Sequence, residues 1–368
     1  MAPITLTDWQ RPEHMSWSYR HVRQLIPTAR VARGAVASPL PRAERAPELP
    51  AVAALLEDAA TDGLIVLHGG EVVVEAYPRG MRPHDTHLLQ SVSKSITGTL
   101  AGVLVGRGAL APHDAVCDHV PELRGTSFDG ASVRDLLDMR AGTRFDETYD
   151  DPASDVRASE AQFGWTQGPP PAPDAIAFLA ALANHRDHGG RFEYRSILTD
   201  VLGLVLERAG GAPFAELLSR ELWALLGAEF DAEVTVDPRG FAVADGGICV
   251  ALRDLARFGR LVLEDGGGVV PADWIADTLR GADDSKAAFA ADPHADDLPG
   301  GHYRNQWWVP AGERVLLGLG IHGQFLYIDP GAGMVAAKLS TWPTPLDPER
   351  RNATLAAFQA VADQLASA

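Results

Sequence analysis

The spacing of apolar residues changes several times along the chain, and each change marks a different kind of element. Apolar runs on either side of Gly69-Gly70 predict a β-hairpin over 64–77. Helical spacing dominates from about 110 to 265, and strand-like runs bounded by Gly and Pro return after about 266. The pattern therefore predicts a hairpin, a helical block and a strand meander, followed by a final helix over about 348–366.

The other predicted elements carry the same signals, a helical period of 3.6 or a short apolar run between turn residues. The predicted helices cover 48–61, 91–105, 132–139, 174–185, 196–210, 212–227 and 251–266. The predicted strands cover 306–310, 314–320, 324–330 and 334–342. A segment rich in Asp, Pro and Gly runs from 141 to 173, and such long loops are often functional lids.

This order of elements predicts an α+β fold. The simplest arrangement joins the N-terminal hairpin to the C-terminal meander in one antiparallel sheet, which the terminal helices cover. Residues 1–110 and 266–368 would then form one discontinuous lobe, and residues 111–265 an inserted, mostly helical lobe. Because ligand sites are common at such junctions, we expect the active site between the two lobes.

Composition and charge narrow the range of functions. Apolar residues make up 46% of the 368 residues and charged residues 22%, which is enough to bury a core. The net charge of −17 argues against nucleic acid and anionic membrane surfaces as partners. The N-terminus does not resemble a signal peptide and no apolar run could span a bilayer, so we expect a cytoplasmic protein. Cys117 and Cys249 are expected to be small buried residues.

The first candidate for chemistry is the tetrad Ser91-Val92-Ser93-Lys94 at the start of a predicted helix. Residues three apart share a helix face at about 5–6 Å between Cβ atoms, so the Lys94 amine can reach the Ser91 hydroxyl. A neutral amine can accept the hydroxyl proton, and the helix dipole disfavours an ammonium near its N-terminus. The free N–H groups at the same helix end can stabilise an oxyanion.

Lysine usage supports this interpretation. The chain holds 29 arginines and only three lysines, Lys94, Lys286 and Lys338. Arginine supplies plain positive charge elsewhere, whereas a lysine can lose its proton. The alternative is a serine at a helix cap followed by a solvent-facing lysine.

Two further motifs follow along the chain. Tyr194 stands at a turn before a strongly apolar helix and is a candidate proton shuttle, although a tyrosine packed at a helix start is the alternative. Residues 318–323 match G-x-G-x-x-G, but a strand follows them, which excludes a dinucleotide site. A glycine-rich edge strand along a substrate fits better, with His322 as the one histidine expected near the pocket.

S-x-x-K, Tyr-x-Ser and a glycine-bearing strand, in this order, resemble the serine β-lactamases and penicillin-binding proteins. The chain is most similar to the class C β-lactamase-like branch and, within it, to the 6-aminohexanoate-dimer (nylon oligomer) hydrolases. The similar stretches run in family order from about residue 85 to 343, namely HLLQSVSKS, YDDPASDV, FEYRSILTDVLG, QWW, GIHGQ and KLSTWP.

The resemblance implies roles for individual residues. Ser91 would be the nucleophile, Lys94 its base and Tyr194 the acid/base partner. The backbone amides of Ser91 and Ile321 would form the oxyanion hole. The implied substrate-binding residues are Tyr149 on a mobile loop, Glu160, Asp245 and Trp307. An acid at position 160 would pair with a substrate ammonium, or it is an exposed loop carboxylate.

Two departures from the lactamase pattern affect the expected substrate. The middle motif ends in Ser196, where lactamases prefer Asn, and the final Lys-Thr-Gly is replaced by Gly318-Leu319-Gly320. Both changes remove groups that bind a β-lactam. We therefore expect a serine hydrolase of linear amides or short-chain esters that needs no cofactor or metal, and a homodimer is one assembly open to it. The alternatives are a β-lactamase or D-Ala-D-Ala peptidase, and a non-catalytic binding protein of the same fold.

Overall fold

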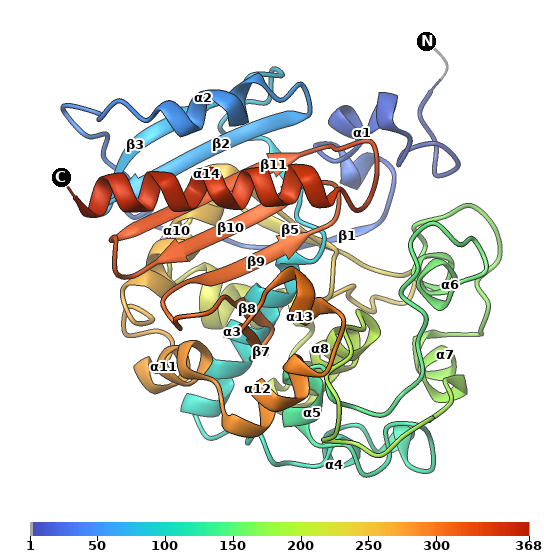
Figure 1. Ribbon diagram of the computed structural model, residues 1–368. Coiled ribbons are helices and arrows are strands. Elements are labelled where there is room, and N and C mark those ends of the chain that lie inside the picture. Colours follow the sequence, from blue (N-terminus) through green and yellow to red (C-terminus); the bar gives the residue numbers. More distant parts are fainter. Residues whose placement is uncertain (1–2, 368) are drawn as a thin grey trace.

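The computed structural model describes residues 3–367 (Figure 1). Its α-helices are α1 (Pro12–Ser18), α2 (Pro50–Glu57), α3 (Val92–Gly106), α4 (Val116–His119), α5 (Val133–Leu137), α6 (Asp155–Gln162), α7 (Ala175–Ala181), α8 (Ile197–Gly210), α9 (Phe214–Leu218), α10 (Leu252–Leu263), α11 (Ala272–Arg280), α12 (Asp283–Ala290), α13 (His294–Asp297) and α14 (Pro348–Ala366). Its strands are β1 (Thr28–Val31), β2 (Thr61–His68), β3 (Glu71–Ala76), β4 (Thr86–Leu88), β5 (Ala232–Thr235), β6 (Ile248–Ala251), β7 (His302–Arg304), β8 (Trp307–Val309), β9 (Leu316–Gly320), β10 (Gln324–Asp329) and β11 (Met334–Ser340). A π-helical turn over Ser219–Trp223 continues α9.

A seven-stranded antiparallel sheet joins the two ends of the chain, in the order β3-β2-β11-β10-β9-β8-β7. The N-terminal hairpin pairs with the C-terminal meander through β2 and β11, where Ile65 faces Ala337. Helices α2 and α14 cover one face of this sheet, and α3 and α10 pack against the other (Figure 1). The predicted union of hairpin and meander is therefore present.

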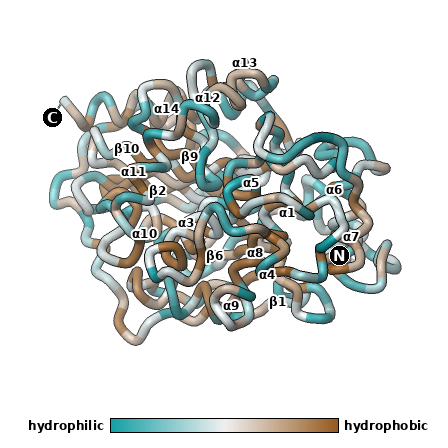
Figure 2. Tube along the Cα trace, turned by 90° about the horizontal axis from the view of Figure 1, so that it is seen from below, coloured by the Kyte–Doolittle hydropathy of each residue, from teal (hydrophilic) through white to brown (hydrophobic). Residues whose placement is uncertain are grey.

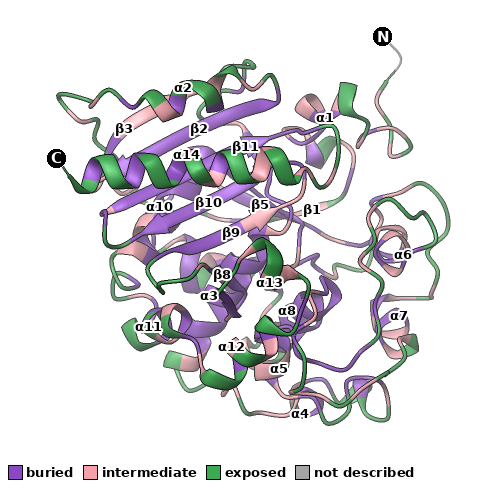
Figure 3. Ribbon diagram, in the orientation of Figure 1, coloured by how far each residue is buried: buried purple, intermediate pink, exposed green. Residues whose placement is uncertain are grey.

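Helices on both faces explain the sequence of the central strands. Every residue of β10 and β11 is buried, so these strands are largely apolar on both faces instead of alternating (Figure 3). Hydropathy along the trace follows the same layering, with apolar stretches in interior elements such as α8 and hydrophilic ones along the outer loops (Figure 2). No helix within residues 3–367 is long and apolar enough to cross a membrane.

The structure corrects three details of the predicted elements. A second sheet of four short strands, in the order β1-β5-β6-β4, adds to the single sheet that was expected. Residues 272–297 form α11 to α13, where strands were expected to have returned. The predicted loop over 141–173 contains α6. One hydrophobic core runs through both proposed lobes. The division of the chain at 110/111 and 265/266 therefore stays a prediction.

Helix α3 is held closely by its neighbours. A Cβ at Gly98 would lie 2.2 Å from the carbonyl oxygen of Asn305, and one at Gly102 would lie 2.5 Å from the Trp274 ring. Real Cβ atoms do not approach other atoms so closely. Glycine at these two positions therefore lets the turn before β8 and helix α11 pack directly on the helix backbone.

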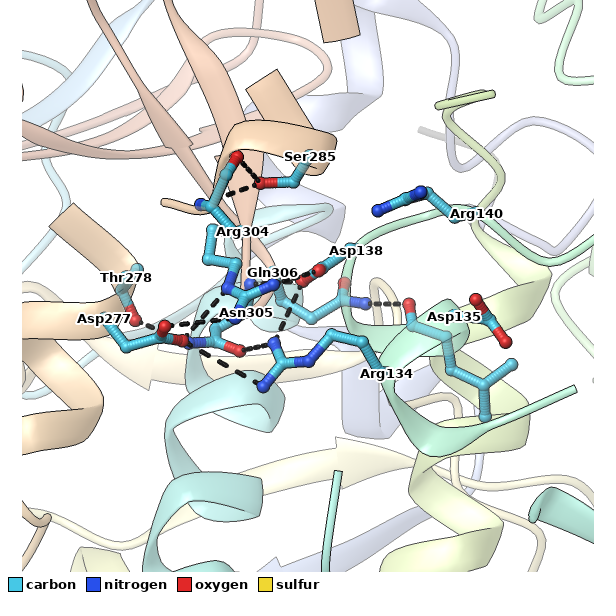
Figure 4. Close-up of polar contacts among 12 residues, drawn as sticks. Arg134, Asp135, Asp138, Arg140, Asp277, Thr278, Ser285, Arg304, Asn305 and Gln306 are labelled. Atoms are coloured by element: carbon cyan, nitrogen blue, oxygen red, sulfur yellow. Dashed lines mark hydrogen bonds and ion pairs between the residues drawn. The ribbon is translucent and has the colours of Figure 1, made fainter. Parts of the chain in front are cut away.

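A buried polar cluster connects the helical block to the meander (Figure 4). Arg304 on β7 donates to Asp138 after α5 (2.7 Å) and makes two hydrogen bonds to Asp277 of α11 (2.9 and 3.0 Å). Arg134 of α5 joins it through Asp138 (3.2 Å) and Asn305 (2.5 Å). The cluster fixes the β7–β8 hairpin, whose turn also contacts α3.

Replacing Arg304 with alanine is expected to lower the free energy of unfolding by about 3 kcal/mol, because it removes a cation beside the fully buried Asp138 carboxylate. Urea denaturation would measure the change. Arg124→Ala is the matched control, because its exposed ion pair with Asp118 should contribute under about 1 kcal/mol. Equal effects of the two substitutions would contradict a structural role for the cluster.

Candidate active site

Ser91 sits where a short strand turns into a helix. Strand β4 ends at Leu88, and Gln90 adopts a left-handed conformation (φ 48°) before Ser91 caps α3. A non-glycine residue in this region is strained and marks a turn that its surroundings enforce. The Gln90 side chain donates to the Tyr19 hydroxyl (2.9 Å), which fixes this turn. The turn presents the Ser91 side chain at the end of the helix.

Lys94 is almost completely buried and points at the serine. Its Nζ donates to Ser91 Oγ (2.9 Å), to the Asp245 carbonyl oxygen (3.1 Å) and to Asp245 Oδ2 (3.4 Å). The helical spacing brings serine and lysine together, and the loop before β6 supplies the other two contacts. The solvent-facing lysine of the alternative interpretation is wrong, because Lys94 is 1% exposed.

The surroundings of Lys94 act on the pKa of its amine in opposite directions. Burial lowers the pKa of this amine, whereas negative charge on Tyr194, Asp245, Glu147 or Asp200 raises it, and the net shift is upward. The Lys94 amine donates its hydrogen bond to Ser91 Oγ in this arrangement.

Tyr194 is the third member of this group. It lies just before Arg195 and Ser196, which lead into α8. The Lys94 Nζ lies 5.2 Å from the centroid of the Tyr194 ring, and this ring stacks on Trp308 with 5.2 Å between centroids. Burial raises the pKa of the phenol, while the Lys94 charge and a hydrogen bond with Ser91 lower it, and the net shift is upward. The phenol is thus protonated and can donate.

Glu147 is a site residue that the sequence pattern did not reveal. Its carboxylate accepts hydrogen bonds from the Ser196 backbone N–H (2.9 Å), the Ser196 hydroxyl and the Tyr149 hydroxyl (2.8 Å). Burial raises the pKa of this acid, and Lys94 and its hydrogen bonds oppose the shift. Glu147 therefore ties the loop bearing Tyr149 to the start of α8.

Asp200 on α8 is a second such residue. Its Oδ1 accepts from the backbone N–H of Asp245 (3.1 Å). Burial and then the neighbouring Asp245 charge raise the pKa of Asp200 well above its usual range. It holds the segment that carries the Asp245 carbonyl against Lys94.

The strand end opposite Ser91 fits an oxyanion hole. A Cβ at Gly320 would lie 3.1 Å from the Ser91 backbone nitrogen, so only glycine allows β9 to approach this closely. Within residues 3–367 the N–H groups of Ser91 and Ile321 donate to no protein acceptor. The Gln324 side chain secures the turn after β9 by accepting from Ser340 N (3.2 Å) and donating to the Ser340 carbonyl (2.7 Å). Two N–H groups without a protein acceptor thus lie where the end of β9 approaches Ser91.

Two cavities meet at this point, and both are lined by Ser91, Tyr149 and Ile321. The smaller, of about 30 Å³, is otherwise lined by Gln90, Val156, Ser159, Glu160, Phe163, Trp165, Ser196, Val243, Asp245 and Gly246. The larger, of about 310 Å³, extends along β9 to α13 and α14 and is mainly apolar.

The predicted substrate-binding residues are distributed unevenly over these cavities. Tyr149 lines both, and Glu160 and Asp245 line the smaller one. Glu160 is neither a free anion nor an exposed loop carboxylate, because Arg157 donates to both of its oxygens (2.7 and 2.6 Å). A substrate ammonium would have to compete with this arginine.

Two of the predicted contacts are wrong in position. Trp307 is buried against Phe258 and lines neither cavity, whereas its neighbour Trp308 lines the larger one. Successive strand residues face opposite sides of a sheet, so Trp307 lies on the face of β8 that is turned away from the cavity. His322 also lines neither cavity, and its Nδ1 lies 2.7 Å from the Trp342 carbonyl oxygen. Burial lowers the pKa of His322 to about 4, so it is a neutral support for the turn.

Comparison with known proteins places this geometry in a family. Residues 50–361 match the beta-lactamase family. The chain belongs to the beta-lactamase family. This family member is a serine hydrolase with the α+β fold expected from its sequence.

Individual relatives extend the assignment. A 6-aminohexanoate-dimer hydrolase of Paenarthrobacter ureafaciens is 41% identical over 93% of this beta-lactamase-family chain and 89% of its own. A Bacillus anthracis structure with a provisional assignment as a 6-aminohexanoate-dimer hydrolase shares 25% identity, with a TM-score of 0.87 over 98% of this chain and 97% of its own. A family VIII carboxylesterase shares the fold alone, with 17% identity and a TM-score of 0.63 over 84% of this chain and 95% of its own.

Proposed function

We propose that this enzyme hydrolyses short-chain esters and linear amides through an acyl-enzyme formed on Ser91. The observation that carries the proposal is the 2.9 Å contact between Lys94 Nζ and Ser91 Oγ where two cavities meet. A nucleophile in contact with a potential base and open to a cleft is the basic requirement for acyl transfer.

The proton path follows from the contacts of Lys94. Its amine must be neutral to accept the Ser91 proton, and besides Ser91 Oγ its Nζ contacts Asp245 Oδ2 at 3.4 Å. Ser91 Oγ then attacks the carbonyl carbon as its proton moves to Lys94. Tyr194 delivers a proton to the departing oxygen or nitrogen and regains one from Lys94. A water molecule attacks the acyl-enzyme in the reverse sense and releases the acid.

Negative charge develops on the substrate carbonyl oxygen during the attack, and backbone N–H groups can stabilise it. The N–H groups of Ser91 and Ile321 are free to bind the carbonyl oxygen as it becomes an oxyanion. Such preorganised donors are worth about 3–4 kcal/mol each in related acyl transfers. The ammonium field of Lys94 adds to them in the tetrahedral state.

Two observations decide among the substrate classes. The family relative named for the 6-aminohexanoate dimer makes a linear amide a candidate substrate. A β-lactam is disfavoured, because Gly318-Leu319-Gly320 offers no cation to a lactam carboxylate and the Ser196 hydroxyl is already bound to Glu147. The alternative of a non-catalytic protein is disfavoured by the contact between Lys94 and Ser91.

A fluorophosphonate probe and a substrate panel test the proposal together. The probe should add once per chain, and mass spectrometry of the digested protein should find it on the peptide containing Ser91. The panel should show turnover of p-nitrophenyl acetate and none of nitrocefin, and it includes the 6-aminohexanoate dimer as a linear amide whose two ends are charged. A folded protein that takes up no probe and hydrolyses no ester would refute the proposal, and rapid nitrocefin hydrolysis would favour a β-lactamase.

Tyr149→Phe is expected to reduce amide hydrolysis more than ester hydrolysis. Tyr149 lines both cavities and its hydroxyl is 2.8 Å from Glu147, so it can contact the scissile N–H that esters lack. Loss of one such hydrogen bond should lower kcat/KM for a linear amide about tenfold and that for p-nitrophenyl acetate less than threefold. Tyr77→Phe, which also removes a hydroxyl bound to a glutamate, is the control away from the cavities. Equal losses on both substrates would remove the proposed contact.

A further inference from the structure

The two cavities beside Ser91 differ in size and chemistry, and the difference bears on the substrate. Polar and acidic side chains form much of the lining of the smaller cavity. The larger one is walled by apolar side chains from the sheet and from α13, α14 and the segments beside them, orange to red in Figure 1. These apolar residues are Leu298, Trp308, Leu319, Phe325, Trp342, Leu346 and Leu355.

Tyr194 determines which part of a substrate enters which cavity. It lines the larger cavity and is absent from the lining of the smaller one. A group that protonates the leaving atom must lie within hydrogen-bond reach of it. The alcohol or amine part therefore extends into the larger cavity, and the acyl chain, on the other side of the carbonyl carbon, extends into the smaller one.

The volumes of the two cavities limit the size of the acyl part and of the alcohol or amine part of the substrate. A volume of about 30 Å³ holds about two water molecules, which leaves room for an acetyl or propionyl chain. The larger cavity, of about 310 Å³, is roughly twice an apolar cavity that takes up benzene. It therefore accommodates an arylalkyl or medium alkyl group.

Charge at the far end of the larger cavity is already neutralised. Arg351 of α14 donates two hydrogen bonds to Asp297 of α13 (3.0 and 2.6 Å). Asp347 caps α14 by accepting from the Arg350 N–H (3.0 Å) and lies 3.5 Å from its guanidinium. A charged substrate end would have to break these pairs, so a neutral apolar group is favoured.

We infer that the enzyme selects esters and amides with a small acyl part and a large, neutral, apolar alcohol or amine part. This inference rests on the proposed function. In the first step the bond from Ser91 Oγ to the acyl carbon forms, the bond to the alcohol oxygen breaks, and the alcohol leaves with the proton delivered through Tyr194. Water then releases the small acid, and the apolar alcohol leaves the larger cavity.

Two isomeric alkyl esters test the direction of binding. 3-Phenylpropyl acetate has a small acyl part and a large alcohol part, and ethyl 3-phenylpropanoate has the reverse. Both are esters of primary alkanols, so their intrinsic reactivities are similar. We expect kcat/KM to be at least tenfold higher for 3-phenylpropyl acetate. A preference for ethyl 3-phenylpropanoate, or no preference, would overturn the inference.

A substitution in the cavity wall locates the effect. Leu355→Trp fills part of the larger cavity and should reduce the ratio of the two kcat/KM values at least fivefold. Ala360→Trp, exposed on the same helix, should leave the ratio as it is. An unchanged ratio in Leu355→Trp would place the arylalkyl group elsewhere and contradict the inference. If both esters are hydrolysed without Ser91, the proposed function itself fails, whereas Ser91-dependent hydrolysis with the reverse preference defeats the inference alone.

Discussion

Ser91→Ala is expected to lower kcat for p-nitrophenyl acetate by about 10⁴-fold or more, because removal of a serine nucleophile leaves only binding and oxyanion stabilisation. The substitution deletes one oxygen and leaves the backbone N–H of the proposed oxyanion hole in place. Steady-state kinetics would measure the loss, and the fluorophosphonate adduct should disappear with it.

The control for this variant is Ser93→Ala on the same helix. The Ser93 hydroxyl is fully buried and accepts from the Ile248 N–H (3.2 Å), so its loss affects packing and not the nucleophile. Ser93→Ala should keep kcat within about threefold of the parent value. Turnover in Ser91→Ala equal to that of Ser93→Ala would reject the acyl-enzyme mechanism.

Lys94→Arg is expected to lower kcat/KM by about 10³-fold although it keeps the positive charge. An arginine does not lose its proton in a protein, so it can stabilise negative charge but cannot act as the base. General acid–base groups typically contribute 10²- to 10⁴-fold, which sets the expected magnitude. Because Lys94 is 1% exposed, the larger guanidinium will also strain the site.

A second variant separates the chemical effect of Lys94→Arg from this strain. Lys94→Met removes the charge, fits the same volume more closely and should be about as inactive as the arginine variant. Lys286→Arg, at a partly exposed ion pair with Glu313, should retain full activity. Activity in Lys94→Arg within tenfold of the parent enzyme would show that the amine serves only as a fixed charge.

The local part of the site could be predicted from the sequence, and the part made by distant segments could not. Helix geometry alone brings Ser91 and Lys94 together, because they lie three residues apart. The other side-chain contact of Lys94 is with Asp245, which is 151 residues away in the chain and joins the site only through the fold. Glu147 was missed for the same reason, since its partner Ser196 lies 49 residues along the chain.

The two tryptophans show another limit of sequence reasoning. Trp307 and Trp308 are adjacent and chemically identical, so only the orientation of β8 decides which one reaches the cavity. That orientation is set by packing of the strand against α10, where Trp307 stacks on Phe258. Nothing in the two residues themselves carries this information.

The same distinction applies to the fold. The hairpin and the meander were predictable because strands of five to eight residues between glycines give a clear pattern, as in β2 and β10. The second sheet was missed because its strands have only three or four residues, too few to establish a period of two. Two of them also lie within a stretch dominated by helical spacing.

The walls of the larger cavity and the reacting groups are carried by different parts of the chain. Ser91 caps α3 and Lys94 lies within it, and the glycines of that helix leave no room for change. The far wall of the cavity instead comes from α13 and the segment from Trp342 to Leu355. Mutant libraries aimed at new alcohols should therefore be confined to this far wall, where diversity can accumulate without disturbing the acylation step.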